Sequence, residues 1–223
     1  MKIKLFVNAL IKFLAGLLLT GLLLFLPAGT LAYPNGWLFI GLLFIPMLVL
    51  GGIMLCRAPD LLQKRLNAKE QEKAQKGVVA LSGLLFFTGF LAAGLDFRFG
   101  WTSVPSWVVA VASVVLLIAY ALYAEVMREN AYLSRTIEIQ EGQKVVDTGL
   151  YGLVRHPMYA VTLWLFLSIP LVLGSWISLV FFLHYPILIV VRIRGEETVL
   201  TQGLAGYTEY KRKVKYRLIP FIW

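Results

Sequence analysis

The chain has 223 residues, of which 59% are hydrophobic and only 15% are charged, and its mean hydropathy is +0.78. In soluble domains about a quarter of the residues are charged, so the composition excludes an ordinary soluble domain and predicts a membrane protein. A single cysteine, Cys56, excludes an intrachain disulfide, and with only two histidines it excludes a zinc site of clustered Cys and His. Because Cys56 ends an apolar run, we expect it to be a small buried side chain.

Four stretches free of Asp, Glu, Lys and Arg are long enough to cross a membrane. A hydrocarbon core of about 30 Å needs roughly 20 apolar residues in a helix, and only helices and closed barrels can cross it. Since strict alternation is absent, we predict spanning helices at residues 13–33, 36–56, 77–95 and 104–124. A signal peptide ending near Thr30-Leu31-Ala32 is the alternative for the first stretch; we favour a retained helix.

Residues 157–191 form a fifth charge-free stretch, which is too long for one upright span. As a single helix it would reach about 52 Å, at about 1.5 Å per residue. Leu173-Gly174-Ser175 offers a turn near its middle. We therefore predict a hairpin of two short helices, at about 158–173 and 176–191, with one tilted or kinked span as the alternative.

The positive charges separate the two sides of this bundle. Residues 1–12, 57–76, 125–156 and 192–223 hold 20 of the 21 Lys and Arg residues, whereas the connections between spans on the other side hold only Arg98. The positive-inside rule therefore predicts that both termini are cytoplasmic. The net charge of +9 then reflects topology and anionic lipid, so no nucleic-acid partner is expected.

The predicted fold is an all-α polytopic membrane bundle. It has four spans plus a C-terminal helical hairpin, which makes five or six membrane segments in total. Residues 1–124 form the N-terminal membrane helices, and residues 125–223 form the candidate functional region. The polar segments 125–156 and 192–223 flank the hairpin, so we expect them to meet in a pocket that is half aqueous and half in contact with lipid. The segment 57–76 is interpreted as a solvated helix without convergent side chains.

The segment before the hairpin allows two interpretations. Gly149 and Gly152 permit a tight turn with close backbone approach to a ligand. Pro157 suits the first turn of a helix, whose free N–H groups could bind a carboxylate. The alternative is a cap at the membrane interface, with three side chains at the headgroups or in the aromatic belt: Arg155, His156 and Tyr159.

The segment after the hairpin begins with Arg192 and Glu196, which share one helix face. Arg192 directly follows apolar residues, so we expect it at interface depth, facing protein or a pocket. A surface ion pair of little energetic weight is the alternative.

Together these elements resemble a known family. Gly149-Leu150-Tyr151 and Arg155-His156-Pro157-Met158-Tyr159 resemble the G-x-Y…R-H-P-x-Y signature of the isoprenylcysteine carboxyl methyltransferase and phospholipid methyltransferase family of integral membrane methyltransferases. In that family a helical hairpin, an R-x-x-x-E pair, a Tyr-rich segment and Ile-Pro follow. Arg192/Glu196, Tyr207/Tyr210 and Ile219-Pro220 occupy those places here. The resemblance covers about residues 125–223.

The resemblance implies S-adenosyl-L-methionine as cofactor, bound at the cytoplasmic face. It implies catalytic roles for Arg192, near the substrate, and Glu196, which also contacts the cofactor. The other implied cofactor-binding residues are a segment that wraps the cofactor and a set of side chains in its pocket: Gln143, Val145 and Val146, then Tyr151, His156, Pro157, Tyr159, Tyr207 and Tyr210.

The function implied is methylation of the carboxylate of a lipophilic acceptor such as isoprenylcysteine. The partner implied is therefore a lipophilic small molecule or a lipidated acceptor, which reaches the site from membrane lipid. A phospholipid amine or a thiol is the alternative acceptor. An NADPH-dependent membrane reductase of the sterol type shares a distant R-H-P-x-Y region, but it typically has Gly-Glu after the motif, where this chain has Ala160-Val161. A non-enzymatic membrane scaffold is the remaining alternative.

Overall fold

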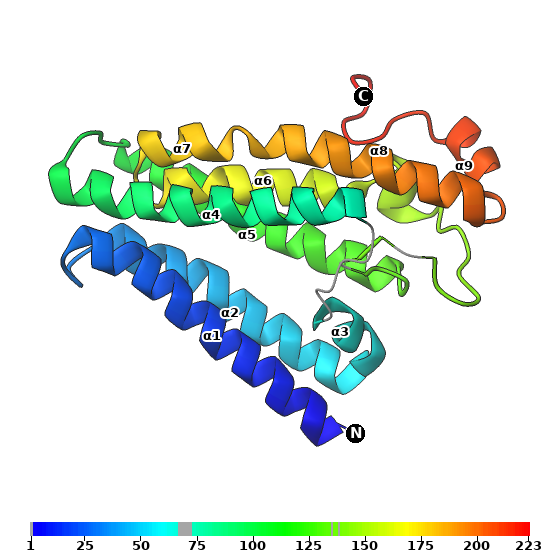
Figure 1. Cartoon of the computed structure of the whole chain (residues 1–223), viewed down its shortest axis with the longest axis horizontal. Coiled ribbons are helices and arrows are strands. Elements are labelled where there is room, and N and C mark those ends of the chain that lie inside the picture. The colour runs from blue at the N-terminus through cyan, green and yellow to red at the C-terminus, as the bar shows by residue number, and fades with distance from the viewer. Residues whose placement is uncertain (1, 67–72, 135, 138) are drawn as a thin grey trace.

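The computed structural model describes residues 2–66, 73–134, 136–137 and 139–223. Within these residues the regular structure is entirely helical. The long helices lie side by side, with the α1–α2 hairpin inclined to the others (Figure 1). The predicted all-α membrane bundle is therefore confirmed, and five of its helical segments are long and apolar enough to cross a membrane.

The first four spans all appear, each extending past at least one end of its charge-free stretch. They are α1 (Lys2–Ala28), α2 (Pro34–Arg57), α4 (Lys73–Phe99) and α5 (Ser106–Glu129), and the short helix α3 (Pro59–Leu66) lies between α2 and α4 in sequence. Helix α1 ends before the predicted boundary because Gly29 adopts a left-handed φ of 69° and donates its N–H to Phe25 O.

The predicted hairpin is confirmed, and the alternative of one kinked span is wrong. Helix α6 (Pro157–Val172) turns at residues 173–175 into α7 (Trp176–Phe182), followed by α8 (Tyr185–Gly203). The second arm breaks at residues 183–184 because Pro186 cannot donate a backbone hydrogen bond to the preceding turn. It also continues beyond residue 191, so the polar residues after the hairpin remain helical. A 3₁₀ turn, η1 (Gly149–Gly152), and helix α9 (Tyr207–Lys213) complete the chain.

The two ends of the bundle differ in chemistry. The N-terminus, α3, α9 and the C-terminus lie at one end (Figure 1), together with the segments rich in Lys and Arg. The opposite end carries exposed tryptophans, which are suited to an interfacial aromatic belt: Trp37, Trp101, Trp107 and Trp176. This division is that of an integral membrane protein, and the cytoplasmic placement of the basic end stays a prediction.

Two glycines in α4 allow close helix packing. A Cβ on Gly94 would lie 2.5 Å from Leu24 O in α1, and one on Gly89 would lie 2.4 Å from the Phe182 ring in α7. Small residues at such positions let membrane helices approach closely. The expectation that Cys56 is buried is wrong, because Cys56 is exposed on the surface of α2. An apolar run predicts a spanning helix, but it does not reveal which residues lie on the outward face of that helix.

A buried carboxylate joins two connections at the end away from the basic segments. Asp96, which is 1% exposed, accepts hydrogen bonds from Thr102 N at 2.7 Å, from the Thr102 hydroxyl at 2.5 Å and from the Ser175 hydroxyl at 2.5 Å. Ser175 in turn accepts from Ser178 N at 3.0 Å and caps α7. Asp96 therefore holds the α4–α5 connection against the turn of the α6–α7 hairpin.

Asp96→Ala should destabilise the fold, because it leaves the partly buried Thr102 N and the buried Ser175 hydroxyl without an acceptor, and a buried group left unsatisfied costs about 1–3 kcal/mol. We expect the thermal unfolding midpoint of the detergent-purified protein to fall by several degrees. Glu141→Ala, which removes an exposed carboxylate, should leave the midpoint in place. Equal midpoints for the two variants would contradict the anchoring role of Asp96.

Candidate functional site

A cavity of about 790 Å³ lies where α8, α9 and the α5–α6 connection meet the basic ends of α2, α3 and α4. Its walls are polar toward α8 and the α5–α6 connection, and apolar toward α2 and α4. All but one of the residues that the family resemblance implied for the site line this cavity: Gln143, Val145, Val146, Tyr151, His156, Tyr159, Arg192, Glu196, Tyr207 and Tyr210. Pro157 begins α6, as predicted, but does not line the cavity.

Helix α8 contributes a polar row to the cavity. Arg192, Glu196 and Leu200 follow one another at i, i+4 and i+8, so they lie on one helix face. Arg192 Nε donates to the Tyr159 hydroxyl at 3.1 Å, which links α8 to the first turn of α6. The expectation that Arg192 faces a pocket is therefore confirmed.

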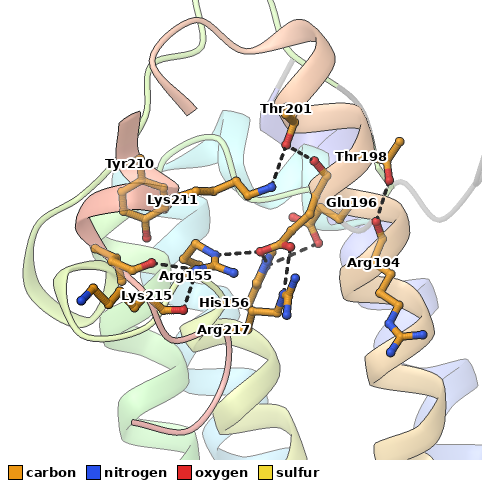
Figure 2. Close-up of polar contacts among 12 residues, drawn as sticks. Arg155, His156, Arg194, Glu196, Thr198, Thr201, Tyr210, Lys211, Lys215 and Arg217 are labelled. Carbon is orange, nitrogen blue, oxygen red and sulfur yellow. Dashed lines mark hydrogen bonds and ion pairs between the residues drawn. The ribbon is translucent and has the colours of Figure 1, made fainter. Parts of the chain in front are cut away.

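The next residue, Glu197, points into the protein and gathers cations from two other segments. Its side chain is 6% exposed. It accepts from Arg155 Nε at 2.7 Å and from Arg217 Nε at 2.9 Å, and His156 Nε2 lies 3.5 Å from Glu197 Oε1. Figure 2 shows Arg155, His156 and Arg217 converging on the adjacent glutamate carboxylates of α8, while Arg194 points away.

Arg155 also fixes the C-terminal tail. Its guanidinium donates from Nη1 to Val214 O and Lys215 O, both at 2.8 Å, and the backbone N–H groups of Arg155 and His156 donate to Tyr216 O and Arg217 O. Arg155 and His156 are buried, so their assignment to lipid headgroups is wrong. The backbone N–H groups that precede α6 bind the tail, because the tail folds back across them.

The glycines before α6 serve internal packing. Gly149 adopts a φ of 50°, and a Cβ there would lie 1.6 Å from Glu129 Oε1. The Glu129 carboxylate accepts from Leu150 N at 3.0 Å. A Cβ on Gly152 would lie 3.2 Å from Asp147 O. The close approach predicted at Gly149 and Gly152 is therefore made by Glu129 and Asp147 of the chain itself, and the prediction of a ligand there is wrong.

Three tyrosines hold the α5–α6 connection against α9. Asn130 Nδ2 donates to the Tyr151 hydroxyl at 3.0 Å, and the Tyr210 hydroxyl donates to Tyr151 O at 2.7 Å. Tyr207 and Tyr210 pack with Val145 in a small apolar cluster. Burial raises the pKa of all three phenols above the usual value for tyrosine, and Glu197 and Glu196 raise that of Tyr207 further. All three are therefore protonated at neutral pH.

Sequence reasoning missed two features of this site. Glu197 was not separated from its neighbour Glu196, because the R-x-x-x-E spacing selects only the residue that shares a face with Arg192. Arg65 was assigned to a solvated helix, yet α3 brings Leu62 and Arg65 into the cavity wall. The amphipathic sequence Leu61-Leu62-Gln63-Lys64-Arg65, directly after a span, was the available signal. Residues 67–72 of that segment lie outside the described part of the chain.

The fold and the cavity define a polytopic helical membrane protein with a site that joins a polar end to an apolar wall. Residues 108–202 match the profile of the isoprenylcysteine carboxyl methyltransferase (ICMT) family. The resemblance stated from the sequence is thereby confirmed for this part of the chain, which holds α6, α7, most of α5 and α8, and much of the cavity.

Three known proteins are similar to this chain to different extents. A solved structure of the eukaryotic intramembrane Ras methyltransferase ICMT shares the fold, with a TM-score of 0.56 and 20% identity over 92% of this chain and 74% of that one. The uncharacterized protein YpbQ of Bacillus subtilis (strain 168) is 26% identical over 74% of this chain and 96% of its own length. Delta(14)-sterol reductase TM7SF2 of Mus musculus is 32% identical over 40% of this chain and 22% of that protein.

Glu197→Ala should release the C-terminal tail, because Arg155 and Arg217 would lose a shared buried counter-charge. Each loss of about 1.4 kcal/mol from the free energy of local opening raises the open population about tenfold. We therefore expect trypsin to cut at residues 211–217 about tenfold faster or more, measured by mass spectrometry of timed digests. Glu196→Ala should not change this rate. Tail cleavage at the native rate in Glu197→Ala would contradict the role of Glu197 as anchor.

Proposed function

We propose that this protein is an integral membrane methyltransferase that uses S-adenosyl-L-methionine and methylates the carboxylate of a lipophilic acceptor such as isoprenylcysteine. The observation that carries the proposal is a cavity in which Arg192, Glu196 and Tyr159 meet an apolar wall. These three residues lie in the region that matches the ICMT family. An electrophile bound among the polar side chains and an amphiphile along the apolar wall would share this space.

The polar end of the cavity suits a charged cofactor. Glu196 Oε2 and the Tyr207 hydroxyl are buried there without a hydrogen-bond partner among the described residues. Buried polar atoms normally have partners, so an acceptor on Glu196 and a donor on Tyr207 are available to a ligand. The cavity volume of about 790 Å³ falls in the range of ordinary small-molecule sites.

The residues would act by binding and positioning. Glu196 would accept hydrogen bonds from ribose hydroxyls or bind the methionyl ammonium, and the Tyr159 ring would attract a sulfonium by cation–π interaction. S-adenosyl-L-methionine supplies an electrophilic methyl group on that sulfonium. Methyl transfer is an in-line displacement, so the alignment of acceptor and methyl group accounts for most of what the protein can contribute.

Arg192 is assigned to the acceptor. A carboxylate acceptor is ionised at neutral pH, so it needs orientation and no general base, and a guanidinium orients a carboxylate through paired N–H donors. Tyr159 would hold Arg192 in place through its hydroxyl. The acceptor would reach the apolar wall sideways from the bilayer, at the cytoplasmic side if the basic end of the bundle lies there.

The local similarity to a sterol reductase favours NADPH-dependent reduction as a second candidate. That similarity spans 91 residues and 22% of the reductase. The Arg192/Glu196 pair fits the methyltransferase pattern better. A phospholipid amine or a thiol as acceptor retains the same cofactor and remains the alternative within the methyltransferase class, although an amine would have to lose a proton before transfer.

Calorimetric titration of the detergent-purified protein with S-adenosylhomocysteine tests the cofactor assignment. We expect saturable binding that Glu196→Ala weakens at least about tenfold, since one charge-assisted hydrogen bond is lost. Glu209→Ala, an exposed acid on α9, is the matched control and should bind as the native protein does. Binding of NADPH in place of S-adenosylhomocysteine would favour the reductase. If a folded protein bound neither S-adenosylhomocysteine nor NADPH, both the methyltransferase and the reductase assignments would be wrong, and the non-enzymatic scaffold would remain.

Arg192→Gln should separate transfer from cofactor binding. With S-farnesylcysteine as acceptor, we expect kcat to fall about 100-fold while the Kd for S-adenosylhomocysteine stays within about threefold, because Arg192 acts on the acceptor group. Arg194→Gln is the control, since Arg194 is exposed and points away from the cluster (Figure 2). A native kcat in Arg192→Gln, or a matching loss in Arg194→Gln, would remove Arg192 from the reaction.

A further inference from the structure

Helix α3 places a basic side chain in the cavity wall, apart from the residues of α6, α8 and α9. Leu61 and Leu62 of α3 are buried in the main core. Leu62 and Arg65, one helical turn apart, both line the cavity. The helix is thus held by its leucines with Arg65 on the cavity side. Met54 and Met127 lie in the same wall and make it apolar.

Within the described residues, the hydrogen bonds of Arg65 are with neutral groups. Nη1 donates to Ser134 O at 3.3 Å, and Nη2 donates to the Tyr123 hydroxyl. The guanidinium also lies 5.5 Å from the centre of the Tyr123 ring. Among the residues that the structure describes, no carboxylate lies within ion-pair distance of Arg65, whereas Arg155 in the same cavity is paired with Glu197.

A half-buried guanidinium that meets no carboxylate in the described part of the chain is suited to an incoming anion. Burial of an unpaired charge is unfavourable. A guanidinium has five N–H donors in a planar fork, and described residues accept from two of those of Arg65. Carboxylate and phosphate oxygens match that fork in charge and geometry. Because the neighbouring wall is apolar, the anion that fits best is joined to an apolar chain.

We propose that Arg65 binds the acidic headgroup, a carboxylate or a phosphate, of the amphiphile whose chain lies along the apolar wall of the cavity. The identification of this amphiphile as the methyl acceptor rests on the function proposed above. Arg65 is then a specificity-determining residue: it selects anionic acceptors over neutral ones, and it acts on binding while Arg192 acts on transfer.

Matched pairs of amphiphiles test this selection, with the protein in neutral phosphatidylcholine nanodiscs. One pair is N-acetyl-S-farnesylcysteine and its methyl ester, and the other is hexadecyl phosphate and hexadecanol; inorganic phosphate is the chain-free probe. For Arg65→Gln we expect the Kd of both acids to rise about tenfold, with the Kd of ester and alcohol unchanged. Arg65→Lys should recover part of the affinity. Arg57→Gln is the control for charge at the same end, because Arg57 is exposed and lies outside the cavity lining.

The kinetic signature separates recognition from structure. In Arg65→Gln the KM for the farnesylated acid should rise about tenfold with kcat near native. If Arg65 served only to fix α3 to Ser134 and Tyr123, the variant would weaken acid and ester equally; that result, or no change in either, overturns the proposal. Inorganic phosphate binding with the same dependence on Arg65 as the two acids would also overturn the requirement for a chain.

Titration of Arg65→Gln with S-adenosylhomocysteine keeps the two proposals distinct. A native protein that binds S-adenosylhomocysteine but shows no preference for the acids over their neutral analogues would defeat the Arg65 proposal alone. A preference for acids that depends on Arg65, in a protein that does not bind S-adenosylhomocysteine, would defeat the methyltransferase proposal and retain Arg65 as an anion-binding residue.

Discussion

The buried carboxylate of Glu197 is the contact on which the site depends. It sits on α8, and its charge is balanced by Arg155 from the segment before α6 and by Arg217 from the C-terminal tail. Breaking such a buried pair from one side leaves an uncompensated charge, which costs about 3–5 kcal/mol. Because Arg155 also binds tail carbonyls, one acid fixes how three segments meet. Its neighbour Glu196 faces the cavity. Of the two adjacent carboxylates, Glu197 therefore holds the segments together, and Glu196 has the role in cofactor binding that we propose.

The membrane explains why these segments meet where they do. The hairpin of α6 and α7–α8 returns the chain to the basic end of the bundle, and Asp96 fixes its turn at the other end. Polar side chains that would be costly in lipid then gather at the interface, facing one another across the cavity. The apolar wall from α2 and α4 continues the same cavity toward the spans. A site that joins a charged ligand to a lipophilic one needs both halves.

Much of the fold was predictable because its constraints are local in sequence. The length of the charge-free stretches predicted the spans, and Leu173-Gly174-Ser175 predicted the hairpin turn. The distribution of Lys and Arg predicted that successive connections lie on alternate sides of the membrane. The site was predictable only through its resemblance to a family, since spacing left Arg155 and Tyr159 open between a headgroup cap and a pocket. Glu197 and Arg65 were missed for a physical reason: which side of a helix faces a cavity depends on packing between segments far apart in sequence, and neither has a distinguishing pattern of its own.

The length of α6 has a consequence for the lipid around it. Its 16 residues span about 24 Å at about 1.5 Å per residue, several ångströms less than a typical hydrocarbon core of about 30 Å. Trp164, midway along α6, is 64% exposed, so this short helix presents a face to lipid. Hydrophobic mismatch of this size is relieved by local thinning of the bilayer. Headgroups beside α6 would then lie deeper than elsewhere in the membrane, which shortens the path of an amphiphile from its leaflet to the cavity.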